Sequence, residues 1–504
     1  MGKSTNTTET VENKKTDTVV FQRLNMFGRT VIYSSVDEIT SENIIPILQK
    51  VWNTHRKNSE ECDYLWEYYN GNQPILKRTK KQRPDICNKI VENRANELVN
   101  FKVGYYAGEP IIYTSKNDSE DYLKAMETLN AYMYGLSKEA QDHDLVEWQM
   151  VAGTAYRIIL PTEKNSPYRE YRPFEMETLD PRTTFVVYST KIGHKKLMAG
   201  TYYKDDNNRR HFTIYTDKYC YKFVEYMLRE GTVTSHALGM IPIFEYPANN
   251  SRLGCFEPVL PLLDELNNLA SNRMDGVEQT VQAFIKFINC NIDEEKYEKF
   301  LEKCAIVVSS TDGGQADVDV VTTDLDQDKT QTMKKEIYDS ILDIVGVPSR
   351  TANASGDSTG SAIILRNGWE TAEARAKSFE LMFKRSEREM LALVLKICRE
   401  NGNMPLLPWE IEPHFTRRNY EAINAKATVL TMMLDNPKIH PILAYEHCGM
   451  FTDPESAWLL SEKYYNEVQA KYEEPTEVEE DEDDEGLVRT DRQIAQAVEE
   501  ENIS

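Results

Sequence analysis

The feature that most constrains this chain is the stretch from Leu325 to Glu400, which predicts a helix, a small polar loop and a second helix of unusual length. In the first helix, apolar residues recur at steps of three and four from Met333 to Val345. Gly346 and Pro348 then predict its end. We therefore expect the rest of the chain to be attached to this pair of helices rather than to form an independent enzyme.

The second helix keeps the same spacing over roughly 40 residues, which corresponds to a rod of about 60 Å. A rod of this length packs along other long helices, in the same chain or in copies of it. One hairpin of a helical bundle is the plain structural interpretation of this pattern. The apolar or small positions are Leu365, Trp369, Ala372, Ala376, Phe379, Phe383, Ser386, Met390, Val394 and Ile397.

The loop between the two helices, residues 350 to 360, consists of small and polar residues. None of its apolar residues is large enough to anchor it in a core. We therefore expect an exposed and mobile loop.

Length and charge limit the possible functions. With 504 residues and 40% hydrophobic residues, the chain can form two to four domains. Its net charge of -23 argues against a protein that coats nucleic acid, because binding phosphates requires concentrated Lys and Arg. The charge is compatible with a protein that lets nucleic acid slide past.

The cysteines and the hydropathy pattern exclude further classes. The eight cysteines are scattered without a C-x-x-C pair, which predicts reduced thiols and neither a disulfide framework nor a zinc site. No run of about 18 apolar residues exists, so we expect no membrane span, and the polar start of the chain predicts no signal peptide.

The first part of the chain predicts an arm followed by helices. Residues 1–17 are polar and are expected to be disordered, and Val19–Leu24 with Thr30–Ser34 predict a small hairpin. Helices are expected at Ser41–Tyr69, Asn88–Val103 and Glu120–Met150. A basic loop lies between the first two helices, where a contact with phosphate and a merely solvated loop are both possible; its residues are Lys77, Arg78, Thr79, Lys80, Lys81, Gln82 and Arg83.

The middle of the chain predicts a sheet. Strands are expected at Ala155–Leu160, Thr184–Tyr188, Met198–Tyr203, His211–Thr216 and Lys222–Met227, with a hairpin turn at residues 205–208. The run Ile241–Tyr246 is expected to close this sheet.

A second long helix is predicted from Phe256 to Ile288, and a compact insert separates it from the helix at Asp326. The insert is expected to hold a helix at Asp293–Leu301 and strands at Ala305–Ser309 and Ala316–Thr322. After Pro405 and Pro408, helices at Tyr420–Leu434, Pro441–His447 and Pro454–Tyr472 predict a small helical unit. The segment 473–485 is almost wholly acidic and is expected to be disordered.

No motif predicts an active site. Gly356–Gly360 matches G-x-S-x-G with Ser358 as the nucleophile, and Asp435 and His440 or His447 follow in the order of a serine hydrolase, but a helix precedes the motif where a strand is required. A polar loop ending in a helix start is the better interpretation. Residues 324–328 resemble the start of a calcium loop but lack its later ligands, so they are better explained as helix capping. We predict no catalytic residue, no metal site and no cofactor.

The order of the parts and several short motifs resemble the portal, or head-tail connector, proteins of tailed bacteriophages, in particular of long-tailed phages of Gram-positive hosts. The resemblance covers about residues 40 to 470. The motifs are Tyr69-x-Gly71-x-Gln73-x-Ile75, Asn88-x-Ile90-x-x-Asn93, Gly104-Tyr105-x-x-Gly108-x-Pro110, Leu179-Asp180-Pro181-x-x-x-Phe185-x-Val187-Tyr188, Gly239-x-Ile241-Pro242-Ile243-Phe244-Glu245 with Asn249-Asn250, and Gly360-Ser361-Ala362-Ile363.

The resemblance implies an α+β, mainly α portal fold. It assigns an arm and hairpin to 1–40, the wing to 41–255, stem helices to 256–288 and 326–346, and a small α/β clip to 289–325. It assigns a tunnel loop to 347–360, a long kinked helix of the wing and tunnel to 361–404, an α-helical crown to 405–472 and an acidic tail to 473–504.

The resemblance also implies a function. Copies of the chain would form a ring, commonly of twelve, which is the channel for double-stranded DNA at one capsid vertex. The implied partners are the terminase large subunit, the major capsid or scaffold protein and a head-tail adaptor, and no membrane. The location would be the virion, after synthesis in the cytoplasm of the host bacterium.

Two groups of residues become candidate sites on this basis. The loop residues that would face DNA are Arg350, Asn353, Ser355, Ser358 and Thr359, although Arg350 at a helix end could equally pair with carbonyls or a nearby acid. The acidic residues that would form the docking surface of the clip are Asp293, Glu294, Glu295, Glu298 and Glu302. Two other classes stay open: a serine hydrolase using Ser358, and a monomeric structural head adaptor.

Overall fold

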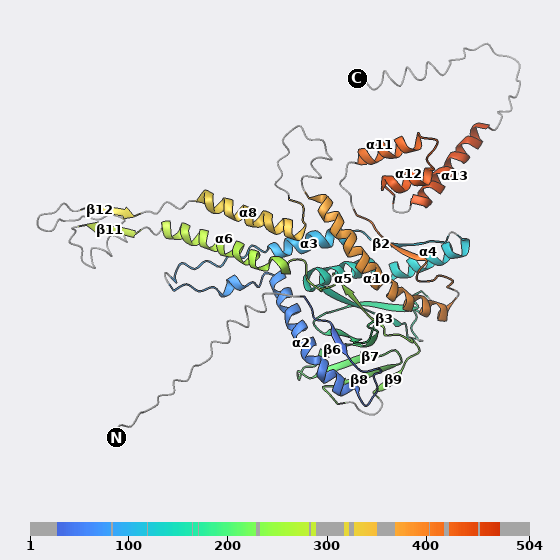
Figure 1. The fold of residues 1–504 in the computed structure, drawn as a ribbon, viewed down its shortest axis with the longest axis horizontal. Helices are drawn as coiled ribbons and strands as arrows, with labels where there is room; N and C mark the ends of the chain where they lie inside the picture. Colours follow the sequence, from blue (N-terminus) through green and yellow to red (C-terminus); the bar gives the residue numbers. More distant parts are fainter. Residues whose placement is uncertain are drawn as a thin grey trace, which may run out of the picture. The chain divides into compact units, whose positions relative to one another are not determined.

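The computed structural model describes residues 28–81, 84–117, 119–163, 165–169, 171–227, 232–281, 284–288, 317–321, 327–349, 368–402, 404–417, 423–451 and 454–473. The chain divides into two compact units, residues 1–422 and 423–504. The predicted α+β, mainly helical class is confirmed (Figure 1).

A six-stranded sheet forms one part of the first unit. Its order is β1 (Ile32–Ser34), β5 (Thr184–Ser189), β6 (Lys196–Lys204), β7 (Arg210–Tyr215), β8 (Tyr219–Val224) and β9 (Val233–Ser235). Helix α2 (Ile44–Tyr69) packs on it, so that Leu48 and Val51 share a core with Phe185 and Phe212. The predicted helix and the β6–β7 hairpin are confirmed.

Strand β1 pairs in parallel with β5, which is distant in sequence. The other predicted strand of its hairpin, Val19–Leu24, lies outside the described residues. Gly28 has a positive φ of 77°, and a Cβ atom there would meet the carbonyl oxygen of Ser251 at 1.7 Å. Only glycine therefore lets the chain just before β1 pass this close to Ser251.

A second sheet has the order β10 (Ile243–Pro247), β3 (Thr154–Pro161) and β4 (Phe174–Leu179). The prediction of a single sheet is wrong, because its strands divide between two sheets: the predicted closing strand, β10, pairs with the predicted strand at Ala155–Leu160, which is β3, and both belong to the second sheet with β4. All five residues of β10 are buried, since the second sheet lies between helices and the core that it shares with the larger sheet. A run buried on both faces carries no alternation that would reveal its partner.

Three helices cover this second sheet and its neighbours: α3 (Arg94–Ala107), α4 (Glu120–Gly135) and α5 (Lys138–Ala152). The helix predicted over residues 120–150 is interrupted, because Ser137 adopts a left-handed conformation with a φ of 51°. The helix predicted from Asn88 begins only at Arg94, where the Asn93 side chain accepts a hydrogen bond from the N–H of Asn96. Two short 3-10 helices, η1 (Pro74–Lys77) and η2 (Glu257–Val259), precede α3 and α6.

The helices α6 (Leu260–Val281) and α8 (Gln327–Val345) lie side by side (Figure 1). They are antiparallel, because the start of α6 and the end of α8 both lie at η2, while Arg273 donates to Gln331 at 2.6 Å further along. The helix predicted to reach Ile288 ends at Val281, and Phe284–Ile288 forms strand β11, which pairs with β12 (Asp317–Val321). The predicted strand at 316–322 and the predicted helix at 326–345 are confirmed.

The long helix α10 (Trp369–Asn401) has 33 residues. Its predicted apolar face is confirmed, because Phe383, Met390 and Val394 lie in the largest core together with residues of α3, α5 and β10. The end of the first unit is β13 (Ile411–Phe415), which pairs with β2 (Ile111–Ser115).

The second unit consists of α11 (Ile423–Leu434), α12 (Pro441–Cys448) and α13 (Pro454–Glu473). These three predicted helices are confirmed. The helical unit expected to begin after Pro405 begins later, at residue 423, because residues 411–415 belong to a sheet of the first unit.

Candidate functional site

The two groups of predicted site residues lie outside the described part of the chain. The loop residues Arg350, Asn353, Ser355, Ser358 and Thr359 fall between α8 and α10, and the acidic residues Asp293, Glu294, Glu295, Glu298 and Glu302 fall between β11 and β12. The structure therefore defines the elements that carry these segments. Ile288 pairs with Asp317, so the insert leaves and returns at neighbouring positions of one small sheet.

The two ends of the loop also come together. At the end of α8, the N–H groups of Gly346 and Val347 donate to the carbonyl of Leu342 at 2.7 and 2.9 Å, and Gly346 has a φ of 70°, which ends the helix. The side chain of Arg375 from α10 covers Gly346, because a Cβ there would lie 2.5 Å from its Cδ atom. At the start of α10, a Cβ on Gly368 would lie 4.0 Å from the Cα of Pro348, so both ends of the loop share one base.

Aromatic residues and an ion pair fix the first turns of α10. The ring of Trp369 lies 6.0 Å from that of Phe101 and 5.8 Å from that of Tyr105 on α3. Tyr105 donates its hydroxyl to Glu373 at 2.8 Å, and Arg417, which follows β13, pairs with Glu373 at 3.1 Å. Arg417 also pairs with a second carboxylate of α10, that of Glu380. The base of the loop is therefore connected to α3 and to the segment that follows β13.

A second attachment runs along α6. We call residues 77–92 the strap; residues 82 and 83 of it are outside the described part. Three backbone N–H groups of the strap, two residues apart, bond to three side chains of α6 that are four residues apart. Glu92, Ile90 and Asn88 donate in this order to Asn267, Ser271 and Asp275 at 2.8, 3.0 and 2.7 Å.

The donors on the strap and the acceptors on α6 align because their spacings along the two segments are nearly equal. Four residues of helix rise about 6.0 Å, and two residues of extended chain advance about 6.6 Å, so the donors and acceptors stay aligned over three bonds. The sequence predicts a helix over Asn88–Asn93, but this segment is not helical, because three of its N–H groups already have partners on α6. Several residues that carry the sequence resemblance lie at this contact. Asn88 and Ile90 bond directly to α6, and Gln73 accepts from Asn267 of α6 and donates to Asn93.

Asp275 also holds the basic part of the strap. Lys80 pairs with its carboxylate at 2.7 Å and Arg78 at 3.3 Å. Burial alone would raise the pKa of the Asp275 carboxyl, but the hydrogen bonds from Lys80 and Asn88 outweigh it and lower this pKa. Two of the cations considered for phosphate contact are thus engaged within the chain, and the phosphate hypothesis for the others stays untested.

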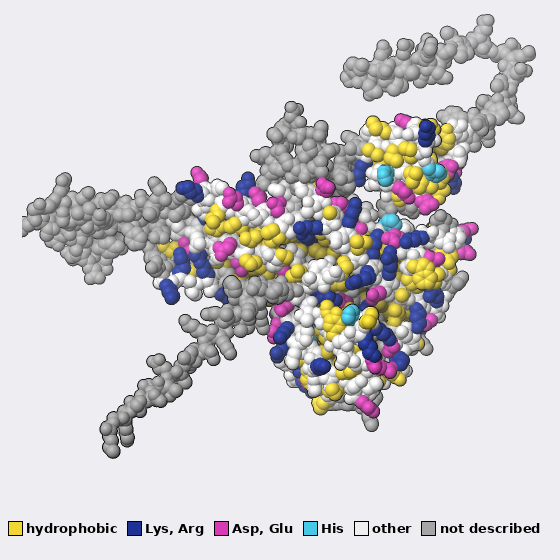
Figure 2. Space-filling model, viewed as in Figure 1, with side chains coloured by type: hydrophobic (Ala, Val, Ile, Leu, Met, Phe, Trp, Pro, Cys, Tyr) yellow, Lys and Arg dark blue, Asp and Glu magenta, His cyan; other side chains and the backbone are white. Residues whose placement is uncertain are grey.

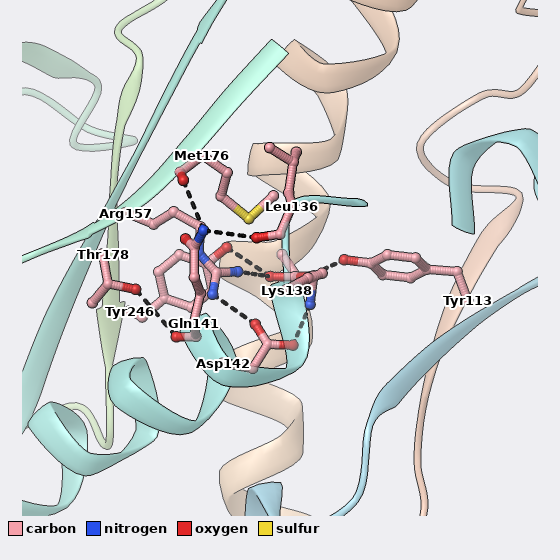
Figure 3. Close-up of polar contacts among 10 residues, drawn as sticks. Tyr113, Leu136, Lys138, Gln141, Asp142, Arg157, Met176, Thr178 and Tyr246 are labelled. Carbon is pink, nitrogen blue, oxygen red and sulfur yellow. Dashed lines mark hydrogen bonds and ion pairs between the residues drawn. The ribbon is translucent and has the colours of Figure 1, made fainter. Parts of the chain in front are cut away.

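A cluster of buried charges joins α10 to the rest of the first unit (Figure 3). Lys138 and Asp142 come from α5, Arg157 from β3 and Glu387 from α10, and each side chain is at most 4% exposed. Arg157 donates to Asp142 at 2.6 Å and lies 3.7 Å from Glu387, while Lys138 contacts both carboxylates, that of Glu387 at 3.0 Å. Two cations and two anions make the cluster neutral.

Two tyrosines complete the surroundings of Glu387. Tyr246 of β10 donates its hydroxyl to one carboxylate oxygen at 2.6 Å, and Tyr113 of β2 donates to the other. Burial would raise the pKa of the Glu387 carboxyl, but Lys138 and Arg157 outweigh it and hold this pKa below its ordinary value. Burial and the charge of Glu387 raise the pKa of both tyrosine hydroxyls well above the usual range, so they remain donors. The carboxylate is therefore a fixed anion that receives contacts from three strands and one helix.

Sequence reasoning did not find this cluster. The predicted apolar face of α10 included Ser386, which is indeed buried, but not its neighbour Glu387. Glu387 lies four residues after Phe383 and three before Met390, on the same apolar face, and a carboxylate at such a position signals a buried partner. The spacing of Lys138 and Asp142 by four residues is the second available signal.

The described residues give no support to a serine hydrolase. Ser358 lies outside them, and the element before the loop is the helix α8 rather than a strand. His440 caps α12, because its Nδ1 accepts from the N–H of Ile442 at 3.3 Å, and its ring lies 5.6 Å from that of Trp458. His447 is exposed in the last turn of the same helix.

Among the residues that the structure describes, no helix is both long and apolar enough to span a membrane. Within the same ranges, no group of three or more His, Cys, Asp or Glu side chains is placed to bind a metal ion.

Comparison with known proteins gives one extensive match. Residues 48–485 match a family described as phage portal protein, SPP1 Gp6-like. Two solved structures are similar at low identity: "Neck of empty GTA particle computed with C6 symmetry" has 13% identity and a TM-score of 0.42, covering 71% of this chain and 90% of the other. "Virion of native gene transfer agent (GTA) particle" has 12% identity and a TM-score of 0.43, covering 78% and 94%. No curated protein matches the sequence.

Proposed function

Because this chain belongs to the SPP1 Gp6-like phage portal proteins and therefore has the role of a portal at the head-tail connection of a virion, we propose that its copies assemble into a closed ring of about twelve subunits around a DNA channel. The observation that carries the proposal is the family match over residues 48–485. The ring would stand at one capsid vertex, where it serves genome packaging, head-tail joining and genome ejection.

We assign the parts of the ring as follows. The helix pair α6 and α8 is the stem, the insert between β11 and β12 is the clip, and residues 41–255 form most of the wing. The loop between α8 and α10 is the tunnel loop, and the helices α11 to α13 form the crown. The common base of the loop supports this assignment, because a loop with fixed ends can project into a channel while its supports stay in the ring wall.

The composition of the loop suits transit of DNA. A channel that lets DNA slide must not hold phosphates tightly, because each Lys or Arg contact releases counterions and adds affinity. Short polar side chains such as Asn353, Ser355, Ser358 and Thr359 offer brief hydrogen bonds, and Arg350 would be the single cation among residues 347–360. The net charge of -23 agrees with a wall that does not retain DNA.

We further propose the terminase large subunit and a head-tail adaptor as partners of the clip, with Asp293, Glu294, Glu295, Glu298 and Glu302 as the docking surface. The major capsid or scaffold protein would contact the ring within the head. The portal family is structural, and we propose no enzymatic activity for this chain. Only covalent labelling of Ser358 with a fluorophosphonate would support the alternative hypothesis of a serine hydrolase.

The native mass of the purified full chain tests the ring. We expect a single species of about twelve times 58.2 kDa by mass photometry, with a central hole in negative-stain images. A 58.2 kDa species that stays monomeric in the presence of the capsid and scaffold proteins would favour the monomeric head adaptor and refute the ring.

A further inference from the structure

A small cavity lies where helix α2 meets the two sheets of the first unit. Its walls come from residues 29–32 at the start of β1, from α2, and from strands β3, β5 and β10. The volume open to a water molecule is about 20 Å³. One buried water needs about 10–15 Å³, so the cavity has room for a single water molecule but not for an organic ligand.

Two side chains in these walls are buried with an unmet hydrogen-bonding group. Figure 2 shows Lys and Arg side chains on the surface of the molecule, where water surrounds them. Arg29 and His55 are instead only 4% and 2% exposed. Within the described part of the chain, Nη1 of Arg29 and Nε2 of His55 have no hydrogen-bond partner. Because a buried polar atom without a partner costs free energy, both atoms call for a ligand in the cavity.

The protonation state of His55 does not remove this requirement. Burial lowers the pKa of His55 to about 4, so its ring is neutral at pH 7. Each nitrogen of a neutral imidazole is either a donor or an acceptor. Nε2 therefore needs a partner in either tautomer, and the ligand must be able to donate or to accept.

Other polar side chains of the walls bond to one another or to the backbone. Asn58 exchanges two hydrogen bonds with the backbone of Thr30, at 2.8 and 3.0 Å. Glu245 accepts from three side chains of the walls, those of Thr154, Tyr188 and Arg252. The unmet capacity is therefore concentrated on Arg29 and His55.

The charges around the cavity favour a neutral ligand. Arg29 has two anionic partners, since its Nε lies 3.1 Å from a carboxylate oxygen of Glu61 and its Nη2 contacts Glu257. Glu245 and Arg252 form a second ion pair in the wall, at 2.6 Å. The cations are thus already balanced, and a bound anion would bring in a buried charge without a counter-ion.

We propose that the cavity binds one water molecule, which accepts a hydrogen bond from Nη1 of Arg29 and forms a second one with Nε2 of His55. Arg29 precedes β1 and His55 lies in α2, so the water joins the start of β1 to this helix beside the Thr30–Asn58 contact. The inference goes beyond the portal role and does not depend on the number of subunits.

A structure of the full-length chain at a resolution that shows ordered water tests the site directly. We expect one peak at about 2.7–3.2 Å from both nitrogen atoms. Crystals grown in sodium bromide distinguish water from an anion, because bromide gives an anomalous signal. A bromide signal at this position, or no peak within about 3.5 Å of both atoms, would overturn the proposal.

Hydrogen exchange at about pH 7 tests the link in solution. The N–H groups of Arg29 and Thr30 donate to Arg252 and Asn58, and their exchange reports how firmly the start of β1 is held. His55→Leu removes the nitrogen that binds the water and should accelerate this exchange about tenfold. His55→Gln keeps a polar atom for the water and should exchange nearly as slowly as the wild type.

A matched control changes a histidine away from the cavity. The side chain of His143 on α5 is 53% exposed, and His143→Leu should leave the exchange unchanged. Equal acceleration by His55→Leu and His55→Gln, or none by either, would contradict the water link. Circular dichroism verifies that each variant is folded, and the structure of the wild-type chain decides the matter if His55→Leu does not fold.

Discussion

Replacing Glu387 by Gln removes one of the two anions from the buried cluster and leaves Lys138 and Arg157 with Asp142 alone. The side chain of Glu387 is fully buried, so water cannot compensate the remaining positive charge. The two tyrosine hydroxyls also lose a charged acceptor. Breaking a buried pair on one side costs about 3–5 kcal/mol, so we expect the free energy of unfolding of the first unit to fall by about 4 kcal/mol.

The control is Glu389→Gln, two residues further along α10. The Glu389 side chain is half exposed and pairs with Lys196, so its loss should cost less than about 1 kcal/mol. A double variant, Lys138→Gln with Glu387→Gln, restores neutrality and should cost less than the sum of the two single changes.

Denaturant unfolding followed by tryptophan fluorescence measures these differences. Five of the six tryptophans lie in the first unit, and only Trp458 lies in the second. The signal therefore reports mainly on the unit that holds the cluster. If Glu387→Gln cost no more than Glu389→Gln, or if the double variant were fully additive, the cluster would not fix α10 in the way its geometry indicates.

Three further predictions concern other parts of the chain. Asp275→Asn should weaken the attachment of the strap by about 1–3 kcal/mol at pH 7. The pKa of the Asp275 carboxyl is lowered in the folded chain, so the difference between wild type and variant should shrink as acid protonates the wild-type carboxylate. Hydrogen exchange at the N–H groups of Asn88 and Ile90 measures this difference. Burial lowers the pKa of His55 to about 4, so the folded chain holds this side chain neutral. As the pH falls from 6.5 to 4, the unfolded chain binds a proton at His55 and the folded chain does not, so the free energy of unfolding should fall by up to about 3 kcal/mol. A His55→Gln variant that lost the same free energy of unfolding over this pH range would contradict this prediction. Deleting residues 351–358 should leave the number of subunits in the assembled ring unchanged but impair DNA packaging. A variant with a Gly/Ser segment of equal length serves as the control, and loss of assembly would show that the loop is structural.

The sequence predicts helices well where one face meets a continuous core. Periodicity located α2, α8, α10 and the helices of the second unit, because each is long or bounded by Pro and Gly. It did not predict where helices begin when tertiary bonds compete. Asn88–Asn93 has a helical pattern, yet its N–H groups bond to α6, which is distant in sequence.

Strands were located more reliably than their partners. The run at Ile243–Pro247 is a strand as predicted, but its burial on both faces concealed that it pairs with β3. Phe284–Ile288 continues an apolar helical pattern, and its pairing with β12 makes it a strand. Glu387 was missed for a related reason: its role depends on Tyr113, Lys138 and Arg157, and no local pattern connects residues so far apart.

The position of Glu387 in the chain also determines when its surroundings can be completed during synthesis. Tyr246 precedes Glu387 by 141 residues and Tyr113 precedes it by 274. At about 5–20 residues per second, a ribosome needs roughly 7–28 s to pass from Tyr246 to Glu387. During that time both cations of the cluster have only one anion, and β2 has no β13 beside it. The nascent chain therefore exposes an unfinished interior until α10 and β13 emerge, and apolar surface exposed in this interval is prone to aggregation.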